Sequence, residues 1–196
     1  MKKYAALLGS LLLMFVGSAQ AGLYNFTGNM KYHNDVIYTY FTVENDATNV
    51  RVWTDSFKEF TNFDPITALW TANGMLIAQN DDNPTVDPLT QTYFDSGFLL
   101  PNLAAGQYIF TMTTFPNFAQ SSLLADGFNF DAQAAIPFKD WLETTYSNSG
   151  FNNIGSFWSV WVDGVDQASN PSVPAPAPIL LFGFGLLAVA FRKFKA

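Results

Sequence analysis

The residues with the clearest chemical potential lie at positions 80–83, which read Asn-Asp-Asp-Asn, with Asp87 close behind. Calcium takes about six to eight oxygen ligands, and a loop rich in carboxylates and amides supplies such oxygens. We assign a candidate calcium site to Asp81 and Asp82, which Asp35 or Asp64 would join where the fold brings their loops together. No EF-hand pattern is present. The alternative is a solvated turn, because Asp and Asn favour turns through their own side-chain hydrogen bonds.

Residues for covalent catalysis are scarce. The chain has no cysteine and a single histidine, His33. A serine or cysteine hydrolase needs a histidine base beside a nucleophile and an orienting carboxylate, and a zinc site needs more nitrogen or sulfur ligands. We therefore expect His33 to lie at the surface, the protein not to be an enzyme, and no cofactor to be required.

Two other site types stay open. A carboxylate pair for glycoside hydrolysis depends only on the separation of two acids, which the sequence does not define. Aromatic residues could also form a platform for sugar rings, although aromatic side chains at strand spacing more often pack in a core, which is the interpretation we favour. The candidates for such a platform are Trp53, Trp70, Trp141, Phe151, Trp158 and Trp161.

The charge distribution argues against one class of partner. Outside the two ends of the chain only Lys31, Arg51, Lys58 and Lys139 are basic, against all 16 acidic residues. Neutralising phosphates requires clustered lysine and arginine side chains. We expect no binding to nucleic acid.

The segments that would position these residues have mostly the pattern of β-strands. Runs rich in β-branched and aromatic residues, separated by turn signals, are typical of strands. Asn73-Gly74 between two such runs is a strong signal for a two-residue hairpin turn. One segment, 137–146, instead has apolar residues at helical spacing. The sequence predicts an all-β, antiparallel β-sandwich or jelly roll with a short helix or packed loop inserted, and its strands are expected at 35–43, 50–54, 66–72, 75–79, 93–100, 107–114 and 157–162.

Both ends of the chain differ from this middle. Residues 1–21 have a basic start, an apolar stretch and an Ala-x-Ala cleavage signal at Ala19 and Ala21, as in a secretory signal peptide. We expect the β-sandwich domain at 22–168, a Pro-rich linker at 169–178, and a transmembrane helix with a basic tail at 179–196. Basic residues after such a helix favour a cytoplasmic C-terminus and stop transfer. These residues are Arg192, Lys193 and Lys195.

The C-terminal pattern resembles a known sorting signal. Val173-Pro174-Ala175-Pro176, a short apolar helix and a terminal basic cluster follow one another in the order of the bacterial PEP-CTERM signal, with Ala175 where the signal usually has glutamate. The resemblance implies processing by an exosortase-type enzyme and a role beside extracellular polysaccharide. An ordinary single-pass membrane anchor is the alternative.

A second resemblance covers residues 33–115. Phe63-Asp64-Pro65 before Leu69-Trp70, then Asn73-Gly74, then Asn80-Asp81-Asp82, then Ala105-Gly106-Gln107-Tyr108, follow the order seen in the bacterial pre-peptidase C-terminal domain. That family implies a small jelly roll, and some of its members bind calcium or polymers.

We therefore expect an exported bacterial protein, held in the membrane at least transiently by its C-terminal helix and then placed at the cell surface or in the extracellular matrix. Its role would be structural or associated with polysaccharide. The alternatives are a calcium- or carbohydrate-binding module and a secreted hydrolase that uses a carboxylate pair.

Overall fold

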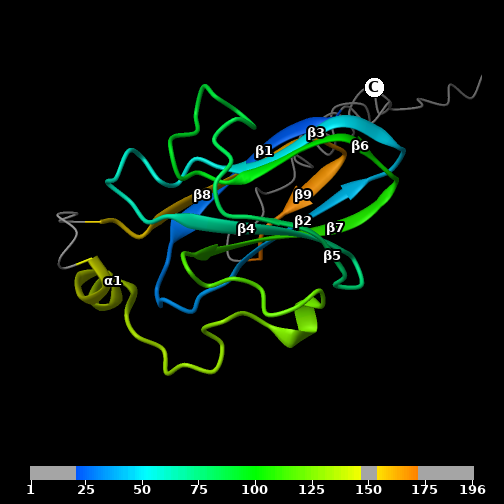
Figure 1. The fold of residues 1–196 in the computed structure, drawn as a ribbon. Helices are drawn as coiled ribbons and strands as arrows, with labels where there is room; N and C mark the ends of the chain where they lie inside the picture. The colour runs from blue at the N-terminus through cyan, green and yellow to red at the C-terminus, as the bar shows by residue number, and fades with distance from the viewer. Residues whose placement is uncertain (1–20, 147–153, 172–196) are drawn as a thin grey trace, which may run out of the picture.

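A computed structural model describes residues 21–146 and 154–171, and two antiparallel sheets packed face to face make up most of this part of the chain. The predicted all-β sandwich is therefore confirmed (Figure 1). The first sheet has the order β1-β8-β3-β6, formed by β1 (Gly22–Asn29), β8 (Phe157–Val165), β3 (Ala47–Thr54) and β6 (Gly97–Leu103). The second has the order β5-β4-β7-β2-β9, formed by β5 (Leu76–Asn80), β4 (Pro65–Thr71), β7 (Gly106–Thr114), β2 (Ile37–Val43) and β9 (Gln167–Ser169).

The strands pair in a nested order. The antiparallel pairs are β4 with β5, β3 with β6, β2 with β7, and β1 with β8. A single long hairpin folded over on itself would have this pairing, with its tip at the β4–β5 turn. Gly74 occupies that turn with φ +81°, a conformation that glycine adopts without steric cost.

Side chains of alternating strand positions form the core between the sheets. In β2, Thr39 and Phe41 are buried while Tyr40 between them is exposed, as expected for a strand that packs one face on a core. The ring of Phe98 in β6 meets the ring of Phe110 in β7 edge to face, with centroids 6.3 Å apart, and so joins the two sheets. In β7, Tyr108, Phe110 and Met112 belong to this core, and Thr111 and Thr113 between and after them are buried as well.

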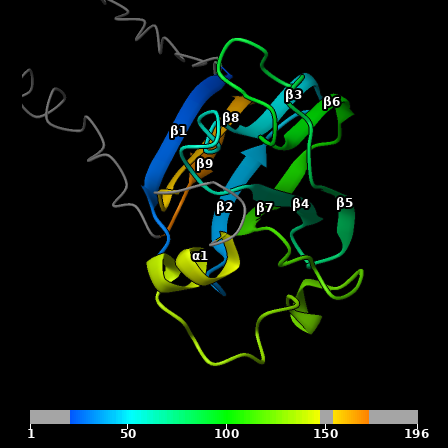
Figure 2. The ribbon, with the colours of Figure 1, turned by 60° about the vertical axis from the view of Figure 1, so that its left-hand side comes forward.

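The predicted helix is also present and closes one end of the sandwich (Figures 1 and 2). In α1 (Phe138–Tyr146) the side chains of Phe138 and Leu142, four residues apart, are buried, and the Phe138 ring packs edge to face on Phe63. Before this helix the chain runs along the outside of the five-stranded sheet and forms the short 3-10 helix η1 (Leu124–Asp126). There Phe128 packs on Trp70 of β4, so this segment covers that part of the sheet.

The observed elements differ from the predicted ones at β1, at β6 and at the end of the sandwich, and β3 and β8 are longer than predicted. Strand β1 was not predicted, because only Phe26 in it is buried and its apolar alternation is weak. The strand expected from residue 93 begins at Gly97 instead, because residues 92–95 form a turn in which the Asp95 carboxylate accepts the Thr92 N–H. The sandwich also continues to Asn170, which is buried and donates a hydrogen bond to Thr39.

Within residues 21–146 and 154–171, no helix combines the length and apolar character needed to cross a membrane. The expected transmembrane helix, the sorting motif at 173–176 and the signal peptide up to residue 20 lie outside the described residues.

Candidate metal centre

The β4–β5 hairpin brings three aspartates together. Asp64 directly precedes β4, while Asp81 and Asp82 directly follow β5. Because the two strands are antiparallel, with Thr67 opposite Asn80, the start of β4 lies beside the end of β5. One end of the hairpin therefore carries all three carboxylates.

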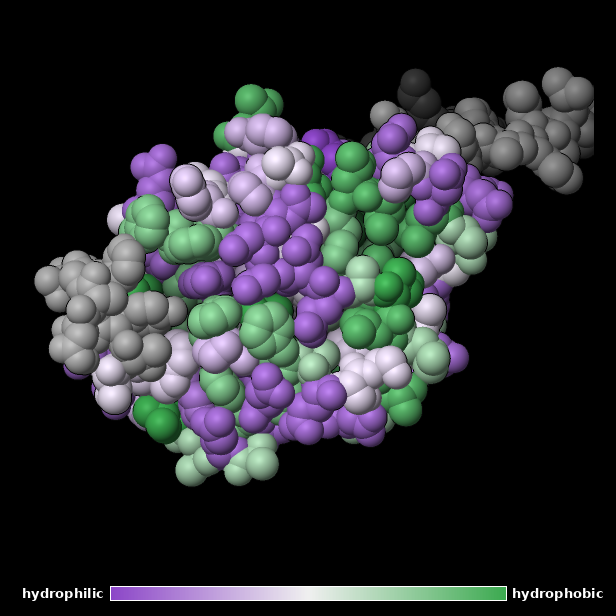
Figure 3. Space-filling model, in the orientation of Figure 1, coloured by the Kyte–Doolittle hydropathy of each residue, from purple (hydrophilic) through white to green (hydrophobic). Residues whose placement is uncertain are grey.

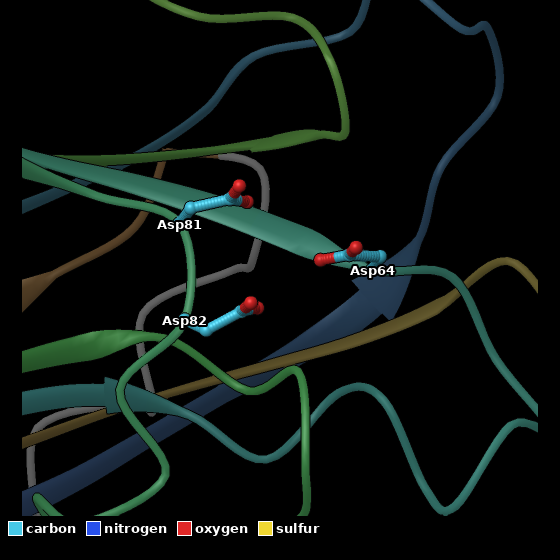
Figure 4. Close-up of side chains that lie close together, drawn as sticks. All are labelled: Asp64, Asp81 and Asp82. Atoms are coloured by element: carbon cyan, nitrogen blue, oxygen red, sulfur yellow. The ribbon is translucent and has the colours of Figure 1, made fainter.

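The three carboxylates point toward one another (Figure 4). One oxygen from each lies within 4.8 Å of the others, and Asp64 and Asp81 are partly buried while Asp82 is exposed. Figure 3 shows hydrophilic residues gathered in a band over the segment that joins β5 to β6. The site is thus a rim position, partly shielded by protein and open to solvent on the side of Asp82.

Burial and mutual repulsion perturb these acids. Burial raises the pKa of Asp64 to about 8, and the neighbouring charges of Asp81, Asp82 and Asp95 add to the increase. Burial also raises the pKa of Asp81, with a further contribution from the Asp82 charge, and it raises the pKa of Asp82. A carboxylate taken partly out of water beside other carboxylates is costly to ionise unless a cation compensates it.

Two of the carboxylate oxygens lack any hydrogen-bond donor. The Oδ1 atoms of Asp64 and Asp81 are buried and have no partner among the described residues. Buried polar atoms in folded proteins are nearly always satisfied, so each such atom calls for an explanation. The unsatisfied oxygens lie within the same group of three acids, where a bound cation would satisfy both.

Asp95 shows the contrasting arrangement. Its side chain is fully buried, yet both of its oxygens accept hydrogen bonds, from the backbone N–H groups of Phe57 and Thr92 and the hydroxyls of Thr54 and Thr92. Burial raises the pKa of Asp95 and these donors lower it. Asp95 is a structural carboxylate with its own donors, whereas Asp64 and Asp81 have none.

The donor set favours a hard cation. Among the described residues, the group of possible metal ligands consists of these three carboxylates, and no histidine or cysteine belongs to it. Oxygen-only sites suit calcium or magnesium, and calcium accepts an irregular set completed by water. The ion pairs among the described residues involve Arg51, Lys58 and Lys139, and none of them reaches this group.

Of the other residues assigned to this site from the sequence, Asp35 lies apart from it. The Asp35 carboxylate belongs to the β1–β2 loop, where it accepts the N–H groups of Lys31 and Tyr32. It is not part of the acidic group. Asn80 and Asn83, which flank Asp81 and Asp82, both donate their side-chain N–H to the Gly97 carbonyl and so tie this segment to β6.

The expectation for His33 is wrong, since its side chain is fully buried. Its ring lies near those of Phe130 and Trp141. The Nδ1 atom accepts the Ile136 N–H, which leaves the proton on Nε2 to donate to Gln133. This histidine ties the segment before α1 to the β1–β2 loop, a role that a lone histidine next to loop residues does not reveal in sequence.

The aromatic residues considered for a sugar-binding platform mostly pack in the core, which is the interpretation favoured from the sequence. Trp53, Trp70 and Trp158 are buried, and the partly buried Trp161 stacks on Trp53 with ring centroids 5.9 Å apart. Trp141 stacks on Phe138 of α1. Phe151 lies outside the described residues. For the carboxylate-pair alternative, the glutamates Glu44, Glu59 and Glu143 are exposed on separate segments.

Comparison of the chain with protein-family models gives no match, and comparison with curated proteins gives none.

Proposed function

We propose that this chain is an exported bacterial surface or matrix protein, non-enzymatic, whose β-sandwich domain binds calcium through Asp64, Asp81 and Asp82. The observation that carries the calcium assignment is the pair of buried carboxylate oxygens without donors, on Asp64 and Asp81. A divalent cation between them would supply the missing partner and offset the repulsion that raises the Asp64 pKa.

The fold supports the resemblance on which this proposal draws. The nested pairing of β1 to β8 has the strand order of a jelly roll, with β9 added at the edge beside β2. The matching residues fall on consecutive elements of that roll: Asp64 before β4, Asn73-Gly74 in the hairpin turn, Asp81 after β5, and Gly106 at the start of β7. We therefore propose a jelly roll of the pre-peptidase C-terminal type.

The cellular location of the protein is proposed from the sequence. The signal-peptide pattern at 1–21 supports export, and the tail at 173–196 supports membrane retention followed by exosortase-type processing. Val173, Pro174, Ala175 and Pro176 would be the sorting residues.

The calcium proposal is tested by thermal unfolding of the full-length chain in EDTA and in increasing CaCl2 or MgCl2. We expect calcium to raise the melting temperature in a saturable manner and magnesium to do so less, because magnesium requires near-ideal octahedral geometry. The variant Asp81→Asn should lose most of the response. The matched control Asp35→Asn changes the same functional group outside the acidic group and should keep the response. Equal melting temperatures in EDTA and CaCl2 for the unsubstituted protein would refute the proposal.

A further inference from the structure

A groove of about 360 Å³ lies on the outer face of the five-stranded sheet, where β9 runs beside β2. This volume lies in the lower part of the range of small-ligand sites. A neighbouring part of the same face, around Trp70, is covered by Phe128 and the segment before α1. The groove therefore lies next to the covered part of the face, and the described residues that line it belong to β2, β7 and β9, with Ala72 after β4.

The side chains at the groove form two rows across three strands. Thr42 of β2 lies opposite Gln107 of β7 on one side and Gln167 of β9 on the other. Two residues away along β2, Tyr40 lies opposite Ile109 and Ser169 in the same way. Strand residues two apart share a face, so a row of amides and a hydroxyl runs beside a row containing an aromatic ring.

The aromatic row offers a flat apolar surface. The side chain of Tyr40 is 40% exposed, and its ring stacks on that of Tyr38 at a centroid distance of 6.4 Å and an interplanar angle of 16°. Tyrosine provides a large apolar face together with a polar hydroxyl, which suits ligands that present both kinds of surface. A pyranose ring has this character, with C–H faces and hydroxyl edges.

The polar row has unused hydrogen-bonding capacity. Among the hydrogen bonds between described residues, none involves the side chains of Thr42, Gln107, Gln167 or Ser169, nor the hydroxyl of Tyr40. An amide supplies two N–H donors and a carbonyl acceptor, and a hydroxyl both donates and accepts. Such groups recognise hydroxyls, which are donors and acceptors themselves.

The absence of charge restricts the ligand further. Among the described residues, no Asp, Glu, Lys, Arg or His lines the groove. The middle of the chain is strongly acidic, with four basic residues against all 16 acidic ones, so an anionic polymer would be repelled. A neutral, polyhydroxylated ligand fits both the groove and the charge of the protein.

We propose that this groove binds a chain of neutral sugar residues, with Tyr40 as the stacking platform and Thr42, Gln107 and Gln167 as hydrogen-bonding groups. The inference rests on the proposed exported matrix role, which places the domain among extracellular glycans. It is independent of the calcium site, which lies at the opposite end of β4 from the groove residue Ala72.

The test is affinity electrophoresis of the full-length chain through gels that contain a neutral polysaccharide (dextran, glucomannan, xyloglucan or arabinogalactan) or the anionic polysaccharide alginate, in a detergent without a sugar headgroup. We expect retardation by at least one neutral polymer and none by alginate. Tyr40→Ala should weaken binding roughly tenfold or more, and Tyr40→Phe should retain most of it because the ring remains. Tyr93→Ala is the matched control, since Tyr93 is 74% exposed and is not part of the groove.

Lack of retardation by every neutral polymer, or equal retardation of Tyr40→Ala, would overturn the inference. So would a loss of self-association in Tyr40→Ala, measured by size exclusion, without any glycan binding, because the face would then be a contact between copies of the chain. Calcium-dependent melting is recorded on the same samples. A protein stabilised by calcium but not retarded by any neutral polymer would disprove the glycan site and leave the calcium site standing.

Discussion

The substitution Asp64→Asn is expected to have opposite effects on the calcium-free and the calcium-loaded protein. Without calcium, the native state holds the Asp64 pKa at about 8, far above its ordinary value of 3.8. The native protein therefore retains a proton that the unfolded chain releases, and the calcium-free protein loses stability as the pH rises from about 4 to about 8. Asparagine has nearly the same shape and no charge, so it removes this loss.

The size of the effect follows from the pKa. One pKa unit corresponds to about 1.4 kcal/mol, so a carboxyl with a native pKa near 8 costs on the order of 4 kcal/mol at pH 7 relative to a neutral group. At about 2–4 °C per kcal/mol for a domain of this size, the full gain corresponds to roughly 8–16 °C. Relaxation and water access around a partly buried carboxylate reduce this gain in stability. We therefore expect Asp64→Asn to raise the melting temperature of the calcium-free protein by about 4 °C or more.

In the presence of calcium, the removal of the Asp64 carboxylate should no longer be an advantage for stability. A ligand at 100 times its dissociation constant stabilises a protein by about 2.7 kcal/mol, and Asp64→Asn should lose most of that response. The assay is differential scanning calorimetry at pH 7 in EDTA and in CaCl2, with Asp140→Asn as an exposed control of equal charge change. A clear drop in melting temperature for Asp64→Asn in EDTA would refute the reasoning, because it would mean that the native protein already satisfies this carboxylate.

Four further predictions concern the pH dependence of calcium binding and three other parts of the molecule. Calcium binding should release a proton from Asp64 and weaken as the pH falls below about 8, and calorimetric titration in buffers of different ionisation enthalpy measures this; a heat that does not depend on the buffer would contradict it. Asp95→Ala should destabilise the protein by about 3 kcal/mol or more at neutral pH, because four donors to its oxygens lose their partner. Urea unfolding measures this loss, and an unchanged midpoint would contradict the prediction. His33→Ala should cost about 2–4 kcal/mol, since it leaves a cavity and an unpaired Ile136 N–H, and faster amide exchange of Ile136 would show the local opening. In the native host, Val173→Asp should abolish tail processing, which intact mass and membrane fractionation would detect. Equal processing of the variant and the unsubstituted protein would exclude the sorting role of this residue.

Much of the fold was predictable because its signals are local. The Asn73-Gly74 turn defined the β4–β5 hairpin, and runs rich in β-branched and aromatic residues identified β2 and β7. A hairpin with a short turn also implies that residues just before its first strand meet residues just after its second. The approach of Asp64 to Asp81 was thus implicit in the sequence, although the prediction treated Asp35 and Asp64 as equally good candidates to join Asp81 and Asp82.

The parts that were not predicted depend on long-range contacts. Strand β1 buries a single large side chain and is held by pairing with β8, about 135 residues later in the chain. The burial of His33 depends on Gln133 and Ile136, about 100 residues away. Asp95 forms a turn where β-propensity predicted a strand, because its carboxylate has donors from two segments. Periodicity and propensity carry no information about partners at such distances.

The position of β1 also bears on how such a chain would cross a membrane with its N-terminus first. β1 is an edge strand whose one neighbour is β8, and β8 is also the link between β1 and β3. The first strand to emerge therefore waits for the last long strand, which ends at Val165, before its sheet can close. Pairing at such sequence separation is slow to form. During most of that passage β1 would therefore stay unpaired, and the four-stranded sheet would close only when translocation is almost complete.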